Sequence, residues 1–133
     1  MMDTVSIFLV CKNDFFFRNI MFLLENRGVI LKGICLDPDT ALEQFNNSGA
    51  DIIIMDANWI NRGYSGKQIL EKLLTKNQHL KVVAVSSTYD NAQVYCLRKS
   101  GAKGYFARGS SGIDEITHCI KQVHLGQFCF LME

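Results

Sequence analysis

One carboxylate, Asp56, stands at the point of this sequence where chemistry is most expected. It directly follows the apolar run Ile52–Met55, which predicts a short strand buried on both faces of a sheet. In an open parallel sheet, ligands bind beyond the carboxyl ends of the central strands. Asp56 is therefore either a functional carboxylate or an ordinary cap of the turn that follows, and this stretch alone leaves both readings open.

Other apolar runs also end in side chains that can do chemistry. These residues supply a thiol, an ammonium group, a hydroxyl and a guanidinium group: Cys11, Lys12, Ser86 and Arg108. Cysteine can act as a nucleophile or redox centre, and lysine and arginine can hold a phosphate. If the strands are parallel and adjacent, all these groups lie at one edge of the sheet with Asp56.

The elements that must position these groups alternate between strands and helices. Strands are predicted at 5–10, 29–36, 52–56, 81–85 and 104–107. Helices are predicted at about 13–27, from Asp37–Pro38 to about 45, around 69–74, at about 91–100 and around 113–123. Right-handed crossovers between parallel strands then give an α/β three-layer sandwich. The expected fold is flavodoxin-like (βα)5 with a parallel sheet in the order 2-1-3-4-5.

Composition restricts the class of protein. The 133 residues, 48% hydrophobic and 20% charged, predict a single globular domain, 1–133. A net charge of +1 argues against a nucleic-acid-binding face, and no apolar run reaches the roughly 18 residues of a membrane span. The five cysteines form no C-x-x-C pair, so we expect most of them to be packed thiols in a reducing cytoplasm.

Taken in order, these motifs resemble the receiver domain of bacterial two-component response regulators. The features that carry the resemblance are Ile-Ile-Ile-Met before Asp56, Val-Val-Ala-Val before Ser86, and Ser-Gly-Ala-Lys-Gly-Tyr-Phe at 100–106 before Arg108. They span the chain from residue 5 to about residue 130. The chain is most similar to the NarL/FixJ (LuxR-type) class, in which a helix-turn-helix domain follows the receiver.

The resemblance implies a role for each residue of the predicted site. Asp56 corresponds to the phosphoacceptor, and Asn58 to the residue whose backbone carbonyl ligates Mg²⁺. Ser86 corresponds to the switch hydroxyl that turns toward the phosphoryl oxygens. Tyr105 corresponds to the aromatic residue whose inward or outward position reports that turn. Arg108 stands where the family has a lysine that pairs with the phosphate.

The sequence departs from this family at the end of its first strand. The family has two acidic metal ligands where this chain has Cys11 and Lys12, whereas Mg²⁺ prefers hard oxygen ligands. At about 6 Å and an effective dielectric of about 20, a lysine repels Mg²⁺ by about 5 kcal/mol. Asp14 is either a substitute ligand or a helix cap. We therefore expect no cofactor, with Mg²⁺ bound weakly or not at all; any Mg²⁺ would be held by Asp56 and the Asn58 backbone.

These departures predict an atypical receiver with a degenerate acidic pocket. Lys12 either forms an ion pair with Asp56 in place of the metal or points into solvent. The module would regulate transcription or another output through protein contacts, and it would not be an enzyme. The alternatives are a conventional receiver phosphorylated on Asp56 by a histidine kinase, and a flavodoxin-like small enzyme or redox sensor that uses Cys11.

Partners are predicted from the last helices and the end of the chain. Receivers of this class commonly dimerise or meet their output domain through the fourth and fifth helices and the fifth strand. Val94, Tyr95, Leu97 and the surroundings of Tyr105 could serve a homodimer here, although packing against the sheet accounts for some of them. The apolar segment 128–133 is either the start of a linker to a C-terminal helix-turn-helix domain or a dimer contact.

Overall fold

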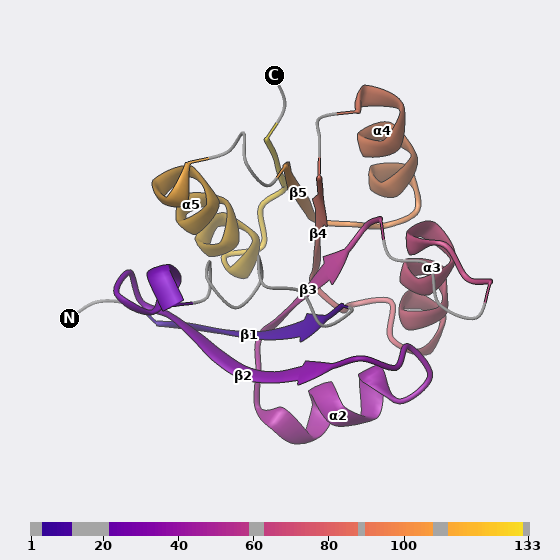
Figure 1. The fold of residues 1–133 in the computed structure, drawn as a ribbon, viewed down its shortest axis with the longest axis horizontal. Helices are drawn as coiled ribbons and strands as arrows, with labels where there is room; N and C mark the ends of the chain where they lie inside the picture. Colours follow the sequence, from indigo (N-terminus) through magenta and orange to yellow (C-terminus); the bar gives the residue numbers. More distant parts are fainter. Residues whose placement is uncertain (1–3, 12–21, 59–62, 88–89, 108–111, 132–133) are drawn as a thin grey trace.

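The sheet has six parallel strands, one more than the sequence predicts. A computed structural model describes residues 4–11, 22–58, 63–87, 90–107 and 112–131. The strand order is β2-β1-β3-β4-β5-β6 (Figure 1). The strands are β1 Val5–Val10, β2 Val29–Cys35, β3 Ile52–Asp56, β4 Val82–Ser86, β5 Gly104–Ala107 and β6 Cys129–Phe130. The predicted order 2-1-3-4-5 is confirmed, and β6 extends it beyond β5.

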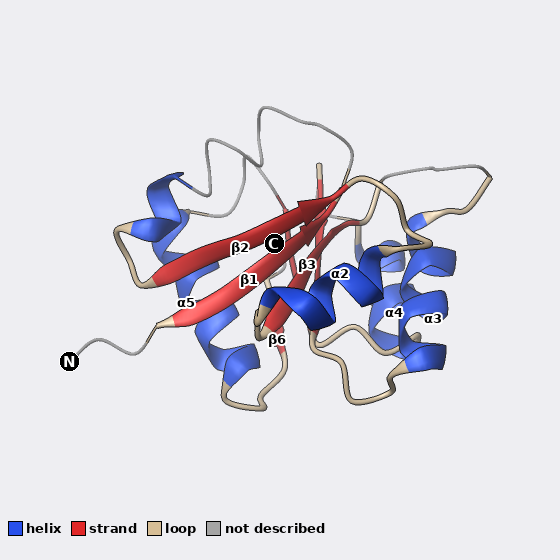
Figure 2. Cartoon of the chain, turned by 90° about the horizontal axis from the view of Figure 1, so that it is seen from below, coloured by secondary structure: helices blue, strands red, loops and turns tan. Residues whose placement is uncertain are grey.

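Helices cover both faces of this sheet and complete the predicted three layers. They are α2 Ala41–Ser48, α3 Gly66–Lys76, α4 Asn91–Lys99 and α5 Ile113–His124, and residues 22–25 are also helical. α2, α3 and α4 lie on one face, whereas α5 lies on the other (Figures 1 and 2). None of the helices in the described ranges is long and apolar enough to cross a membrane.

The central strand β3 shows why its sequence is continuously apolar. Ile53 and Met55 pack in the cluster under α2, α3 and α4, whereas Ile52 and Ile54 pack in the cluster under α5. Successive side chains of a strand point to opposite faces, so a strand covered on both sides needs apolar residues at every position.

Register brings the ends of the central strands level with one another. Val10 pairs with Met55 across β1 and β3, and Asp56 pairs with Val85 across β3 and β4. Ser86 then pairs with Ala107 across β4 and β5. The residues that end these strands therefore meet at one edge of the sheet, as the sequence predicts.

The second helix begins later than the Asp37–Pro38 signal predicts. α2 starts at Ala41, after a turn in which the Thr40 amide donates to the Asp37 carbonyl at 3.3 Å. The Asp37 carboxylate accepts from the Asp39 amide at 3.0 Å. Asp37 therefore caps this turn instead of the helix, because its side chain bonds the backbone two residues ahead.

The end of the described chain forms strand β6 against β5. The Cys129 amide donates to the Lys103 carbonyl at 3.0 Å, and the Leu131 amide donates to the Tyr105 carbonyl at 2.8 Å. The Phe130 ring lies under the Arg98 guanidinium, 5.1 Å from ring centroid to Cζ. Part of the segment predicted as a linker or dimer contact thus belongs to the sheet, and it covers the edge of β5.

Candidate functional site

Asp56 ends β3 in a fixed position at the edge of the sheet. Asp56 is only 5% exposed, and its Oδ1 accepts a hydrogen bond from the Asn58 amide at 2.9 Å. The next amide, that of Ala57, donates to the Val85 carbonyl at 2.7 Å. The strand pairing therefore continues past Asp56, and the local turn holds the carboxylate in place.

The Asn58 side chain joins the end of β3 to the end of β4. Its Oδ1 accepts from the Ser86 hydroxyl at 3.1 Å and from the Ser87 amide at 2.7 Å. Ser86 is 1% exposed, so this hydroxyl is bonded inside the protein. The structure thus brings together Asp56, Asn58 and Ser86 as predicted. The bridging role of the Asn58 side chain was not predicted, because only its backbone carbonyl had an implied role.

Tyr105 is turned inward and is connected to the same edge of the sheet. It is fully buried, and its hydroxyl donates to Gln93 Oε1 at 3.1 Å. Gln93 Nε2 in turn donates to the Ala57 carbonyl at 3.5 Å. Gln93 was missed by sequence reasoning. The available signal was Asp90, whose side chain accepts from the Gln93 amide at 3.3 Å and so fixes Gln93 in the first turn of α4.

Ala57, directly after β3, lies close to the start of α3. A Cβ atom placed on Gly66 would lie 2.3 Å from the Ala57 carbonyl oxygen, so only glycine fits here. Ser65 and Gln68 form a capping box beside it, with the Ser65 amide donating to Gln68 Oε1 at 2.9 Å. The first turn of α3 is therefore packed directly against the residue that follows Asp56.

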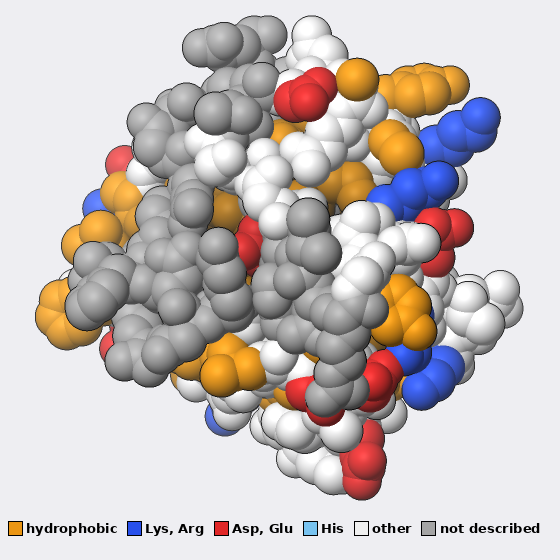
Figure 3. Space-filling view, turned by 45° about the vertical axis from the view of Figure 1, so that its right-hand side comes forward, with side chains coloured by type: hydrophobic (Ala, Val, Ile, Leu, Met, Phe, Trp, Pro, Cys, Tyr) orange, Lys and Arg blue, Asp and Glu red, His pale blue; other side chains and the backbone are white. Residues whose placement is uncertain are grey.

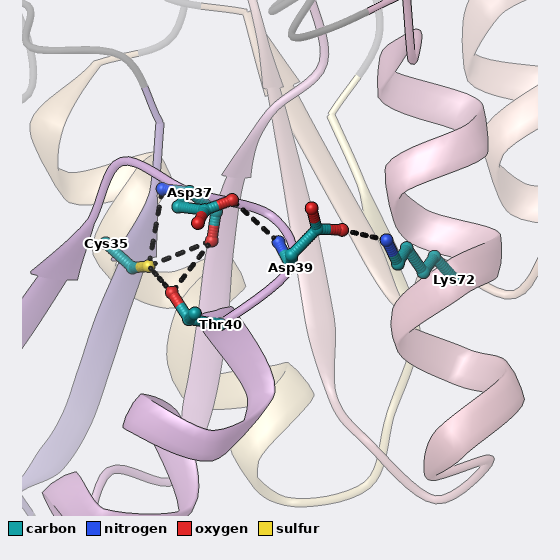
Figure 4. A network of polar contacts seen from close by, with 5 residues as sticks. All are labelled: Cys35, Asp37, Asp39, Thr40 and Lys72. Carbon is teal, nitrogen blue, oxygen red and sulfur yellow. Dashed lines mark hydrogen bonds and ion pairs between the residues drawn. The ribbon is translucent and has the colours of Figure 1, made fainter.

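The β1 side of the site holds a thiol. Cys11 is 2% exposed, and its amide donates to the Cys35 carbonyl at 3.2 Å. The neighbouring Cys35 thiol donates to the Asp37 carbonyl at 3.1 Å, and Thr40 Oγ1 lies 3.6 Å from its sulfur (Figure 4). The Cys35 thiol and the polar groups of Asp37 and Thr40 therefore hydrogen-bond one another in the turn after β2.

An ion pair extends this turn toward α3. Lys72 of α3 bonds the Asp39 carboxylate, which lies beside Asp37 and Thr40 (Figure 4). The hydrogen bond that the Lys72 ammonium group donates to the Asp39 carboxylate raises the pKa of Lys72. Among the described residues, no group of three or more histidine, cysteine or acidic side chains is arranged to hold a metal ion.

Two predicted site residues, Lys12 and Arg108, lie outside the described residues, and so does Asp14. The Lys12–Asp56 ion pair and the phosphate-pairing role of Arg108 therefore remain predictions. Within the described part, the donors that the resemblance implies for Mg²⁺ are the Asp56 carboxylate and the Asn58 carbonyl, and the Cys11 thiol stands on the β1 side. A thiol is a poor ligand for Mg²⁺, so this donor set fits the ion poorly.

The predicted dimer face is smaller than its sequence suggests. Val94, Leu97 and Tyr105 are each at most 3% exposed and belong to the core, whereas Tyr95 is 67% exposed. Of Val94, Tyr95 and Leu97, the three residues named for this face, only Tyr95 is therefore exposed. The others pack against the sheet, which is the alternative that their spacing had left open.

Comparison with curated proteins finds relatives among response regulators. No family model matches the chain. The response regulator GacA of Pseudomonas aeruginosa is 32% identical over 77 residues, which cover 58% of this chain and 35% of GacA. A Ycf55-like protein of Synechocystis is 25% identical over 111 residues, which cover 84% of this chain and 20% of that protein. The chain thus spans only part of the length of these relatives.

Solved structures of receivers superpose on almost the whole chain. A LuxR-family two-component response regulator from Aurantimonas has a TM-score of 0.83 and 20% identity, covering 96% of this chain and 89% of its own. The receiver domain of RcsB from Salmonella enterica has a TM-score of 0.81 and 11% identity, covering 97% and 94%. The receiver domain of NarL from Mycobacterium tuberculosis has a TM-score of 0.78 and 21% identity, covering 94% and 99%. The predicted resemblance is confirmed: this chain has the fold of a response regulator receiver domain.

Proposed function

We propose that this chain is an atypical receiver, a signalling module that acts through protein contacts and is phosphorylated weakly or not at all on Asp56. The observation that carries the proposal is the thiol beside the phosphoacceptor position. Val10 pairs with Met55, so Cys11 and Asp56 follow paired residues on adjacent strands. Cys11 is buried there, in the place that the family gives to a carboxylate.

The chemical consequence is a loss of charge neutralisation at Asp56. Bound Mg²⁺ would shield the negative charge that develops when a phosphoryl group reaches the carboxylate. Cys11 supplies no oxygen ligand, and Lys12 adds a positive charge where the family has a negative one. Lys12 can itself neutralise Asp56, and the domain would then hold one conformation without phosphorylation.

The groups on the other side of Asp56 support a second candidate, a conventional receiver phosphorylated by a histidine kinase. Asp56, Asn58 and Ser86 are linked by hydrogen bonds, and Tyr105 is joined to Ala57 through Gln93. Such a connected network can transmit a change at Asp56 to α4. This candidate needs Lys12 or Arg108 to replace the metal.

The output would be exerted by a partner or a further domain. GacA, RcsB and a LuxR-family protein are named as response regulators among the relatives and structures that resemble this chain. We propose that a C-terminal helix-turn-helix domain follows in the native protein and that the receiver regulates transcription in the cytoplasm.

A homodimer would use the face around Tyr95, where the Lys99 ammonium lies 6.0 Å from the Tyr95 ring centroid. Basic and hydrophobic side chains lie side by side at the upper right of Figure 3, the part of the molecule where Figure 1 shows α4.

The test is incubation with Mg²⁺ and acetyl phosphate or beryllofluoride. Intact mass detects a phosphoryl adduct, and chemical shifts near Asp56 and Tyr105 detect beryllofluoride binding. We expect no adduct and no shifts in the wild type. A Cys11→Asp/Lys12→Asp variant should gain a response to both reagents, because it restores the acidic pair. The matched control adds Asp56→Asn to that variant and should abolish the response.

The opposite result separates the two candidates. A stable wild-type adduct, with shifts that spread from Asp56 to Tyr105, would reject the atypical receiver and support the conventional one. An adduct that survives in Asp56→Asn would place the modified residue elsewhere. Thiol-dependent turnover lost in Cys11→Ser would instead support the enzyme predicted as a third alternative, although the burial of Cys11 argues against it.

A further inference from the structure

Two cysteines from different elements meet where β6 joins the sheet. Cys119 lies on α5 and is fully buried, and its thiol donates to the Cys129 carbonyl at 3.1 Å. The Cys129 side chain packs against the apolar cluster under α5, the helix that carries Cys119. The two cysteines are therefore in contact, although ten positions separate them in the sequence.

The two members of the pair differ in their access to solvent. Cys129 is half-buried on the short strand β6, whereas Cys119 is on the buried face of α5 and is shielded from solvent. Burial is the main cause that raises the pKa of the Cys119 thiol, and the contact with Cys129 raises it further. Cys119 is therefore not the sulfur that an oxidant attacks first. An oxidant from solvent therefore meets Cys129 first, and Cys119 is in place to react with the product.

We propose that Cys119 and Cys129 form a redox-active thiol pair that a hydroperoxide converts to a disulfide. In the first step, the Cys129 sulfur attacks hydrogen peroxide and becomes a sulfenic acid, with release of one water molecule. In the second, the Cys119 sulfur attacks the Cys129 sulfur. The S–O bond breaks, a disulfide forms, and the hydroxyl group leaves as water with the Cys119 proton. A thiol reductant reverses the change by exchange.

The disulfide would fix the end of the chain to the sheet. In the reduced state β6 is held by non-covalent contacts: the amides of Cys129 and Leu131, the stacking of Arg98 on Phe130, and apolar packing against the core. A covalent bond from β6 to α5 removes the freedom of this segment to detach. Because Leu131 bonds the Tyr105 carbonyl, oxidation would hold the segment beside a residue of the candidate site.

The experiment treats the reduced chain with a small excess of hydrogen peroxide and maps the products. We expect the intact mass to fall by about 2 Da, because two hydrogen atoms are lost, and to recover with a thiol reductant. Trypsin cleaves after Lys121, so the peptides 109–121 and 122–133 should appear as one cross-linked species. The amides of Cys129 and Leu131 should exchange with solvent at least about tenfold more slowly in the oxidised protein.

Three variants make the result specific to this pair. Cys119→Ala and Cys129→Ser should each abolish the cross-link, and Cys129→Ser, at the less buried position, tests the pair if Cys119→Ala does not fold. Cys96→Ser, at another half-buried cysteine, should leave it intact. A wild-type protein that gains oxygen at Cys129 without cross-linking, that links a different pair, or that does not react would overturn the proposal. These outcomes do not depend on Asp56 or Mg²⁺.

Discussion

The two sides of Asp56 differ in the side chains that surround it. On the β4 and β5 side, polar side chains are joined across elements: Asn58 bonds Ser86, and Gln93 bonds both Tyr105 and the Ala57 carbonyl. On the β1 and β2 side, Cys11 is buried beside the backbone of Cys35, and the polar groups after β2 bond one another. One side is a connected set of polar side chains, whereas the other has the buried Cys11 thiol where the receiver family has a metal-binding carboxylate.

This difference separates two properties that a receiver fold usually combines. A connected hydrogen-bond network between strand ends depends on neutral side chains and is compatible with a dry, packed interior. A Mg²⁺ site requires several carboxylates close together, which repel one another unless the ion is bound. A chain can therefore lose the acidic residues and keep the network without losing its fold.

The largest effect should come from placing a charge on the β1 side. Cys11→Asp puts a carboxylate at a position that is 2% exposed, and an unpaired buried charge should lower the free energy of unfolding by about 3 kcal/mol at neutral pH. Chemical denaturation measures the change. Cys11→Ala is the control and should cost about 1 kcal/mol, since it removes only a sulfur atom. Equal costs for the two variants would show that this side tolerates charge.

A smaller effect should come from cutting the network on the β4 side. Asn58→Ala removes the acceptor for the Ser86 hydroxyl and the Ser87 amide and should cost about 1 kcal/mol. It should also shift the resonances of Ser86 and of residues near Asp56. Asn77→Ala is a matched control, because the Asn77 side chain at the end of α3 accepts one hydrogen bond, from the backbone amide of His79. If Asn77→Ala shifted the Ser86 resonances equally, Asn58 would not be a specific bridge.

The smallest effect should come from the ion pair at the turn after β2. Asp39→Asn removes the partner of Lys72, and we expect thermal unfolding to change little at neutral pH, since exposed pairs contribute little. The pKa of Lys72 is raised by Asp39, so any stabilisation is present at neutral pH and is lost as the pH rises through the raised pKa. A variant that unfolds earlier at neutral pH but equally at strongly alkaline pH would show this dependence. A large loss that salt does not reduce would contradict the expectation.

The sequence predicted most of the fold because each element carries a strong pattern. Apolar runs marked the five long strands, and the periodic apolar residues of α3 and α5 marked helices that pack against the sheet. The start of α2 was predicted too early, since Asp37–Pro38 can open either a helix or a turn. β6 was missed because two residues carry no period, and its pairing depends on the edge of β5.

The candidate site was predicted in part. Strand ends placed Asp56, Asn58 and Ser86 near one another, since parallel strands share an edge, whereas Tyr105 was implied only by the resemblance to receivers. Gln93 and the side-chain role of Asn58 were missed because they depend on the angle at which α4 and the loop after Asp56 approach the sheet. The contact between Cys119 and Cys129 was missed for the same reason, as the return of the chain from α5 to β6 is not marked in the sequence.

By itself, the sequence determined the alternation of strands and helices and the residue types at each strand end. These follow from local periodicity and from the requirement that a doubly covered strand be apolar. Tertiary structure decided which of those residues touch. Hydrogen bonds such as Tyr105 to Gln93 form within a few ångströms, and that distance is set by the packing of whole helices against the sheet. Side-chain contacts between distant elements therefore required the structure.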